Sequence, residues 1–412
     1  MPDRSAAQTR GLQSIDKTGG QTRKSSARAY LVAATALVAA TYGMCRFGFG
    51  LTLPRVTETL AVSAGIAGTA SSLAFATYCI CAILAGALVR RGWIGVSIVG
   101  AGVTGVVGSA LIAMASGASL LLIGAAIAGA APGFVSPAIA AGLTQTAPED
   151  KEPRWQAIAN AGTGFGVLAA GIGAIWLPWR LSWIVYAVLT LVAATALLVQ
   201  SWNGSRRRPE RSDGTKQEIP GRVSALITPV VLALCMGGGS AVFWTFGRSQ
   251  AESTANLSTL TSTLVWCAVG TAGIFGALSG DFITRIGFRA TWALNSLLLG
   301  VAIAGSALTT NGVLFIVIGL IFGATYVVLC GAQISAAAIA WPSATGAGTA
   351  ITFTAIAVGQ VLGSAAAGSV IDAFGISAAF ILGGSVCVFG GLIALITSFG
   401  SQTSSAQNGK KQ

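Results

Sequence analysis

Long apolar segments separated by short polar stretches make up most of this chain. Each apolar segment has about the 20 residues that a helix needs to cross the hydrocarbon layer of a membrane. Each is predicted to be helical, because backbone N–H and C=O groups in lipid must bond to one another. The twelve expected spans are 29–53, 65–88, 94–115, 119–144, 156–177, 181–200, 223–247, 257–279, 290–309, 312–340, 347–371 and 377–398.

One long polar stretch, "SWNGSRRRPERSDGTKQEIPGR" at 201–222, divides these spans into two sets of six. Its glycine, proline, serine and basic residues are typical of an aqueous loop. We therefore expect an all-α integral membrane protein whose helices form two bundles. The expected parts are a basic tail (1–28), an amino-terminal bundle (29–200), the linker (201–222), a carboxyl-terminal bundle (223–398) and a second tail (399–412).

Composition supports a membrane protein. Of the 412 residues, 54% are apolar and only 9% are charged, against roughly 25% charged in soluble domains. The formal charge of +12 lies in loops, so it does not indicate a nucleic-acid partner. All seven cysteines fall in apolar segments without metal-site spacing, histidine is absent, and no phosphate-binding glycine loop is present. We expect no metal, no cofactor and no enzymatic activity, because the residues for acid–base or metal chemistry are missing.

The basic residues are distributed unequally between the two sides of the membrane. Of the 24 Lys and Arg residues, 20 fall on the side that carries both tails and the linker, while Arg55, Arg180 and Arg248 fall in loops on the other. Cytoplasmic loops are enriched in Lys and Arg. We therefore expect a multi-pass protein of the plasma or inner membrane with both termini in the cytoplasm.

Two loops repeat in corresponding positions of the two halves. "GALVRRGWIGV" (86–96) follows the second span and "GALSGDFITRIGFR" (276–289) follows the eighth. Both resemble the Gly-x-Leu-Ala-Asp-Arg-x-Gly-Arg-Arg loop of the major facilitator superfamily, with Arg90 and Thr284 in place of the aspartates. The residues that match or occupy the motif positions are Gly86, Arg90, Arg91, Gly92, Gly280, Arg285, Gly287 and Arg289.

The resemblance implies a monomeric secondary transporter whose two bundles rock around a small-molecule site near the middle of the bilayer. It also implies that the loop cations bond to helix carboxyl ends across the bundle interface and so favour one access state. The Arg46–Phe47 pair is in addition similar to the cyanate-transporter-like branch of the superfamily.

Arg46, in "TYGMCRFGFGL" (41–51), is the charged residue that stands within an apolar span. An arginine at this depth costs about 2.5–3.5 kcal/mol on insertion scales and usually faces a protein interior or a cavity. In the superfamily the first helix lines the cavity, so Arg46 is a candidate to bind an anionic group. The alternative is that it reaches the interface or pairs with helix carbonyls. Tyr42 and Phe49 are expected on the same helical face as Arg46. They either contact the substrate or pack in the protein core.

Other polar or aromatic residues stand on spans that line the cavity in this family. Each is either a pocket contact or a partner in interhelical hydrogen bonding. These candidates are Tyr78, Ser136, Asn160, Trp244, Tyr326, Gln333 and Gln360.

Acidic residues are the last constraint. All twelve map to tails, loops or span ends. Coupling of transport to protons would therefore need Asp372 or Asp281 to lie deeper than expected, or the substrate itself to carry the proton. Uniport and exchange are equally compatible with the sequence.

We expect a secondary transporter of a small polar, anionic organic solute. The alternative is an exporter of amphipathic drugs or toxic metabolites.

Overall fold

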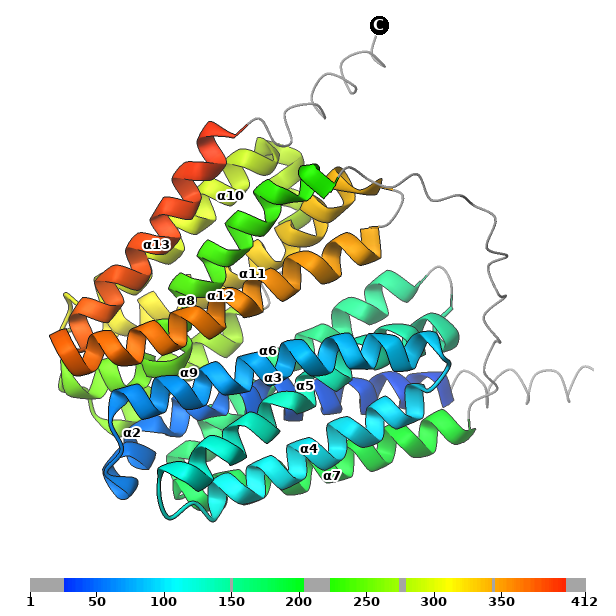
Figure 1. Ribbon diagram of the computed structural model, residues 1–412, viewed down its shortest axis with the longest axis horizontal. Coiled ribbons are helices and arrows are strands. Elements are labelled where there is room, and N and C mark those ends of the chain that lie inside the picture. Colours follow the sequence, from blue (N-terminus) through cyan, green and yellow to red (C-terminus); the bar gives the residue numbers. More distant parts are fainter. Residues whose placement is uncertain (1–25, 149–150, 204–222, 274–278, 343–344, 398–412) are drawn as a thin grey trace, which may run out of the picture.

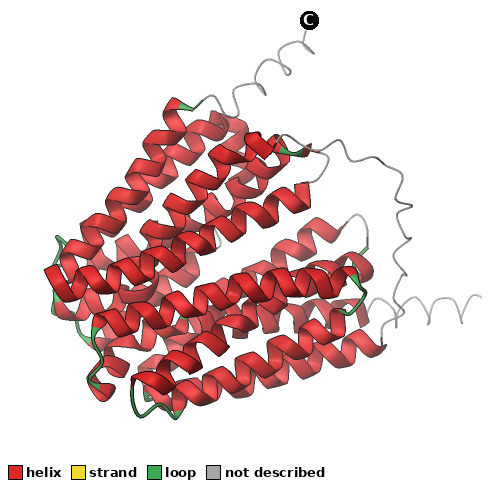
Figure 2. Cartoon of the chain, in the orientation of Figure 1, coloured by secondary structure: helices red, strands yellow, loops and turns green. Residues whose placement is uncertain are grey.

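The computed structural model describes residues 26–148, 151–203, 223–273, 279–342 and 345–397. Within these ranges all regular secondary structure is helical (Figure 2). The first span, Ser26–Leu60, contains the π-helix η1 (Ala39–Arg46) and α2 (Gly48–Leu60). The other helices are α3 (Ala64–Arg90), α4 (Ile94–Ala113), α5 (Ala118–Thr146), α6 (Glu152–Trp176), α7 (Trp179–Asn203), η3 (Val223–Leu226), α8 (Ile227–Ser253), α9 (Thr259–Ala272), α10 (Ser279–Ser306), α11 (Gly312–Ala340), α12 (Thr345–Phe374) and α13 (Ile376–Ile396).

The predicted all-helical membrane fold is confirmed. Eleven of the described helices are long and apolar enough to span a bilayer, and α9, with 14 described residues, is the shorter twelfth. The span expected at 257–279 continues into residues 274–278, which lie outside the described ranges. Figure 1 shows the helices of each half packed together as a bundle, with the ends that flank the linker, α7 and η3, on the same side of the molecule.

The two bundles meet mainly through three helix pairs, α3 with α12, α6 with α9, and α2 with α8. Small residues bring the backbones close, as is usual between helices in membranes. A Cβ atom on Gly68 would meet the Cα of Gly368 at 3.0 Å, and one on Gly164 would meet the carbonyl oxygen of Gly270 at 2.8 Å. The ribbons of the two bundles join away from the linker and splay apart toward it (Figure 1).

Polar contacts also close the joined end. The carboxylate of Asp372, at the end of α12, accepts hydrogen bonds from the backbone N–H groups of Ala64 (3.1 Å) and Gly65 (2.7 Å) at the start of α3. A helix amino terminus carries a partial positive charge, so a carboxylate there is stabilised. Asp372 is exposed at this helix end, and it links one bundle to the other.

Replacing Asp372 by asparagine should loosen this closure, because one carbonyl oxygen replaces two charged acceptors. A surface contact of this kind shifts an equilibrium by about two- to fivefold. Spin labels at Met114 and Leu308, both exposed on this side, would report the distance between the bundles. We expect a larger population of long distances in Asp372→Asn, and an unchanged distribution would show that the contact does not control closure.

One expectation about this end is wrong. The seventh span was expected to end at residue 247 with Arg248 in a loop, but α8 continues to Ser253 and Arg248 is only 3% exposed. Its guanidinium donates to Glu252 (2.9 Å) and to the carbonyl oxygen of Leu51 in the other bundle (2.5 Å). The internal acidic partner allows the helix to continue through a charged residue. Arg46 is therefore not the only cation that lies inside the helical bundles.

Candidate functional site

The turn that carries Arg46 is a π-helix over Ala39–Arg46, closed by a hydrogen bond from Phe47 N–H to the carbonyl oxygen of Tyr42 (3.2 Å). Single π turns within α-helices frequently mark functional sites, because the extra residue redirects the side chains that follow. Gly43 lies directly against the backbone of Gly166, where any side chain would collide. This contact fixes the turn against α6.

Aromatic rings surround the guanidinium of Arg46. Its central carbon lies 4.1 Å from the ring centroid of Tyr78, 4.9 Å from Phe75, 5.4 Å from Phe47 and 5.6 Å from Tyr42. In the plane of the guanidinium, Nη2 donates a 2.7 Å hydrogen bond to Oε1 of Gln360. Arg46 therefore contacts the amino-terminal bundle through aromatic rings and the carboxyl-terminal bundle through one edge of its guanidinium.

These contacts stabilise the cation without neutralising it. A cation–π contact contributes about 0.5–2 kcal/mol and a hydrogen bond to a charged group about 1.5–3 kcal/mol, which together offset the insertion cost of about 2.5–3.5 kcal/mol. Among the described residues, the ion pairs involve Arg55 and Arg248 but not Arg46, and the buried Nε of Arg46 has no hydrogen-bond partner. Arg46 thus has no internal counter-ion in the described part of the chain.

Three hydroxyl groups lie beside the cation. The hydroxyl of Tyr42 donates to that of Tyr78 (3.3 Å) and lies 2.5 Å from Oγ of Ser136 on α5. Tyr42 is partly exposed and Ser136 is exposed, although they bond to each other. This edge of the cluster is therefore accessible, and it presents hydroxyl groups next to a positive charge.

A second chain of contacts runs into the carboxyl-terminal bundle. Gln360 on α12 is fully buried and, besides accepting from Arg46, donates from Nε2 to the hydroxyl of Tyr326 on α11 (3.2 Å). The ring of Tyr326 lies 5.3 Å from that of Trp244 on α8, and Trp244 stacks on Phe47 of the other bundle at 3.9 Å. Polar and aromatic contacts thus join the two bundles around Arg46.

Most of the candidate residues named from the sequence come together here. Tyr42, Arg46, Tyr78 and Ser136 form the amino-terminal side, and Trp244, Tyr326 and Gln360 the carboxyl-terminal side. We call these seven residues, with Phe47 and Phe75, the Arg46 cluster.

Three candidates lie outside the cluster. Phe49 is buried, and no ring or cation contact joins it to Arg46 within the described part of the chain. Asn160 is exposed on α6. Gln333 is fully buried, with its Nε2 at 3.4 Å from the carbonyl oxygen of Pro229 and its Oε1 unpaired among described residues.

Sequence reasoning missed Phe47 and Phe75. Phe75 stands three residues before Tyr78 on α3, so helical spacing could have identified it. Phe47 could not be found in this way, because neighbouring residues do not face each other on a regular α-helix, whereas Phe47 follows a π turn and lies beside the guanidinium. The same turn removes Phe49 from the face that α-helical spacing assigned to it.

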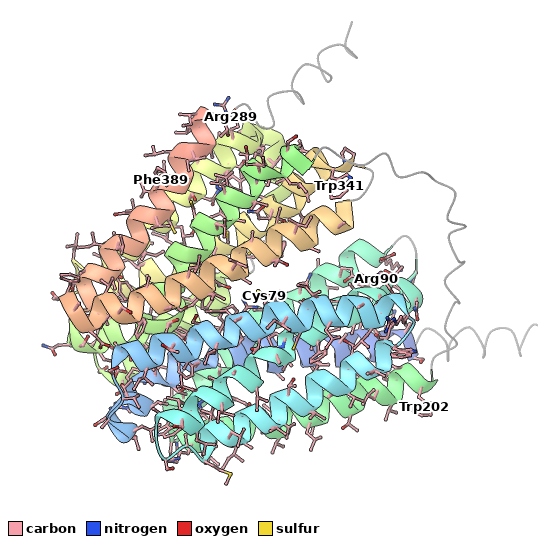
Figure 3. All side chains as sticks on the ribbon, viewed as in Figure 1. Cys79, Arg90, Trp202, Arg289, Trp341 and Phe389 are labelled. Carbon is pink, nitrogen blue, oxygen red and sulfur yellow. The ribbon has the colours of Figure 1, made fainter. Side chains whose placement is uncertain are left out.

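The repeated loop residues lie at the linker-side ends of the bundles. Gly86 and Arg90 are on α3, Arg91 caps it, and Gly92 follows with a φ of 79°. In the second copy Gly280 and Arg285 lie on α10, which is broken at Gly287, where φ is 82°. Arg289 donates to the carbonyl oxygens of Ala394 and Leu395 at the end of α13. Figure 3 shows Arg90 and Arg289 on different bundles. Arg289 thus bonds to a helix carboxyl end of its own bundle, whereas we expected a contact across the interface.

Comparison with known proteins identifies the fold. The sequence profile of the Major Facilitator Superfamily matches residues 35–340. A bacterial homolog of the human lysosomal transporter Spinster, solved inward-facing and unoccupied, has a TM-score of 0.70 at 15% identity, over 90% of this chain and 95% of its own. The nucleoside transporter NupG has a TM-score of 0.70 at 11% identity, with coverages of 89% and 98%.

A variant of the peptide transporter POT has a TM-score of 0.71 at 14% identity, covering 89% of this chain and 93% of its own. The comparison with curated protein sequences found no match. At these identities the solved structures establish the fold alone, whereas the profile match covers well over half of the sequence. The chain belongs to the Major Facilitator Superfamily and is a membrane transporter, not an enzyme.

Proposed function

We propose that this protein is a secondary active transporter of a small organic anion, which binds at the Arg46 cluster and crosses by alternating access. The observation that carries the proposal is the unneutralised guanidinium of Arg46, surrounded by rings and bonded to an amide instead of a carboxylate. A guanidinium edge matches the geometry of a carboxylate. The hydroxyl of Tyr78, which accepts from Tyr42, keeps its own hydrogen as a donor for a second polar group on the substrate.

Gln360 has a specific part in this proposal. Its Oε1 occupies the edge of Arg46 that a substrate carboxylate would use, and it comes from the opposite bundle. A carboxylate that displaces it gains a charged hydrogen bond and breaks one polar link between the bundles. Binding would in this way change the contacts that hold the two bundles in one arrangement, as alternating access requires.

The proposed setting follows from the distribution of basic residues. We place the linker and both termini in the cytoplasm of a cell whose plasma or inner membrane holds the protein. In this orientation the joined ends of the bundles, with Asp372 and Arg248, face outward, and the splayed ends face the cytoplasm. The anion site is then reached from inside in the arrangement described here, and no nucleic acid or second protein chain is part of the proposed mechanism.

A substrate panel in proteoliposomes tests the proposal. Purified protein would be offered radiolabelled monocarboxylates, dicarboxylates, neutral amides of the same size and lipophilic cations, with and without imposed pH and voltage gradients. We expect uptake of at least one carboxylate and none of its neutral amide. Transport restricted to neutral or cationic compounds would refute the anion assignment.

The second candidate is an exporter of amphipathic compounds, and the aromatic contacts favour it. Trp244 packs against Phe47, Trp266, Phe322 and Tyr326, with ring centroids between 3.9 and 6.0 Å apart. All five rings are buried in this arrangement, so this candidate requires the bundles to separate before the rings bind flat apolar molecules. The panel separates the two candidates, because this one predicts that lipophilic cations or neutral drugs move and that carboxylates do not.

Substituting Gln360 by glutamate should lower the rate of anion transport while Arg46 stays in place. The new carboxylate would stand at the position from which Gln360 Oε1 contacts Nη2 at 2.7 Å, so the guanidinium would have a permanent internal counter-ion. We expect a loss of at least about tenfold in kcat/KM for the anion, the effect of one charged hydrogen bond.

The matched control for this prediction is Gln360→Met, which removes the hydrogen bond without adding charge and should retain the preference for anions. Equal activity of Gln360→Glu and wild type would mean that the edge of Arg46 facing Gln360 is not the anion-binding edge.

A further inference from the structure

A groove separate from the Arg46 cluster lies on the carboxyl-terminal bundle. It has a volume of about 350 Å³, at the lower end of the range for small-molecule sites. Three helices form it: α8 contributes residues between Leu234 and Val242, α12 residues between Gly359 and Ala367, and α13 residues between Ala379 and Val386. These segments lie within the central parts of α8 and α12, away from the helix ends.

Missing side chains produce the groove. Gly359 and Gly363 lie so close to the α8 backbone that a side chain at either would collide with it, and Gly383 packs against Val242 on α8. The three helices are thereby held together at their backbones. Gly238, in contrast, has open space beside it: a Cβ atom there would meet only the carbonyl oxygen of Gly359 at 3.6 Å and Cγ1 of Val386 at 4.0 Å. The groove therefore has a close-packed floor and an unfilled volume above it.

The groove opens on the surface that faces lipid. At its rim Leu362 is 63% exposed and Leu382 is 50% exposed. Further along α13, Phe389 points away from the bundle (Figure 3) and is also exposed. All of the lining side chains are apolar or are cysteine or glycine. The opening is thus continuous with an apolar surface on helices that span the membrane.

The Arg46 cluster contacts a different face of α12 from the one that lines the groove. Gly359 and Leu362 line the groove, whereas Gln360 between them is fully buried and bonded to Arg46 and Tyr326. Helical geometry separates neighbouring residues by about 100° around the axis. One face of α12 can therefore line the groove while another face contacts Arg46. A ligand in the groove would contact α12 without touching the transported molecule.

We propose that the groove binds one acyl chain of a membrane phospholipid. Hydrocarbon surrounds its mouth at this depth, and water would find no polar side chain to bond in it. An empty groove would deprive its walls of dispersion contacts, which a flexible acyl chain supplies. The lining carries no charge that could hold a headgroup, so the contact is with the chain alone.

Photolabelling in proteoliposomes tests this proposal. The probe is a phosphatidylcholine with a diazirine in the middle of one acyl chain, and the labelled positions would be mapped by peptide mass spectrometry. We expect labelling around Leu362 and Leu382 to exceed, at least about threefold, that at Leu191 and Val301, which are as exposed but lie outside the groove. The excess reflects the longer residence of a bound chain.

The matched variants are Gly238→Leu and Gly305→Leu. A leucine at 238 would enter the groove, and its Cβ atom would meet its neighbours only at 3.6 Å and beyond. Residue 305 on α10 has nothing within 4 Å of its would-be Cβ atom. We expect Gly238→Leu to remove the excess labelling and Gly305→Leu to leave it, with the thermal midpoint in detergent as a check on folding. Uniform labelling, labelling unchanged by Gly238→Leu, or labelling only by a water-soluble diazirine would overturn the proposal.

Discussion

Replacing Arg46 by alanine is expected to lower kcat/KM for the transported anion at least about 30-fold. Removing one partner of a buried, hydrogen-bonded charge pair costs about 2–5 kcal/mol, and 2 kcal/mol corresponds to that factor. The loss should be larger than for other residues of the Arg46 cluster, because only Arg46 supplies a full charge there. Initial rates of uptake into proteoliposomes, at equal amounts of reconstituted protein, would measure it.

Arg46→Lys is the matched control for this experiment. Lysine keeps the positive charge but presents a single ammonium group instead of a planar fork, and it would contact the rings of Tyr78 and Phe75 less extensively. We expect transport between that of wild type and alanine, with the preference for anions retained. If both variants transport the anion at the wild-type rate, Arg46 does not bind it.

Replacing Arg248 by alanine is expected to have the largest effect on stability. Arg248 is buried and bonds to Glu252, Ser262 and the carbonyl oxygen of Leu51. Its removal would leave a mostly buried carboxylate without its cation, which costs about 3–5 kcal/mol in proteins. The variant should show a clearly lower thermal midpoint in detergent and reduced yield in the membrane.

A double substitution distinguishes loss of the ion pair from loss of packing. Arg248→Met with Glu252→Gln removes both charges and keeps most of the volume, and replacing a buried pair by neutral groups is often close to neutral. We therefore expect its thermal midpoint to recover toward the wild-type value. A midpoint as low as that of Arg248→Ala would attribute the effect to packing, or to the lost bond with Leu51.

Hydropathy predicts this fold well because the membrane leaves few alternatives. A backbone in lipid must be helical, so each apolar segment of sufficient length marks one helix, and α11 begins and ends at the expected residues 312 and 340. The predicted end of α8 was wrong for a local reason. A charged residue such as Arg248 is typical of a loop, but Glu252 one turn later pairs with it inside the protein. Contacts between side chains are not visible in hydropathy.

The candidate site was predictable to the extent that polar residues in a membrane need partners. Arg46, Tyr42, Tyr78 and Gln360 follow this rule and bond to one another. Gln333 follows it too, but it contacts the backbone of Pro229 and not the Arg46 cluster. A buried amide has several possible partners, so the sequence does not predict which one it contacts. The role of Phe47 depends on the π turn, which no hydrophobic pattern indicates.

The central claim is that Arg46 recognises the charge of the substrate. It is tested most directly by binding affinities, measured by titration calorimetry, for the transported carboxylate and for its neutral amide, in wild type and in Arg46→Ala. We predict that wild type binds the carboxylate at least about tenfold more tightly than the amide and that the variant binds both equally. A preference for the carboxylate that persists in Arg46→Ala would contradict the claim.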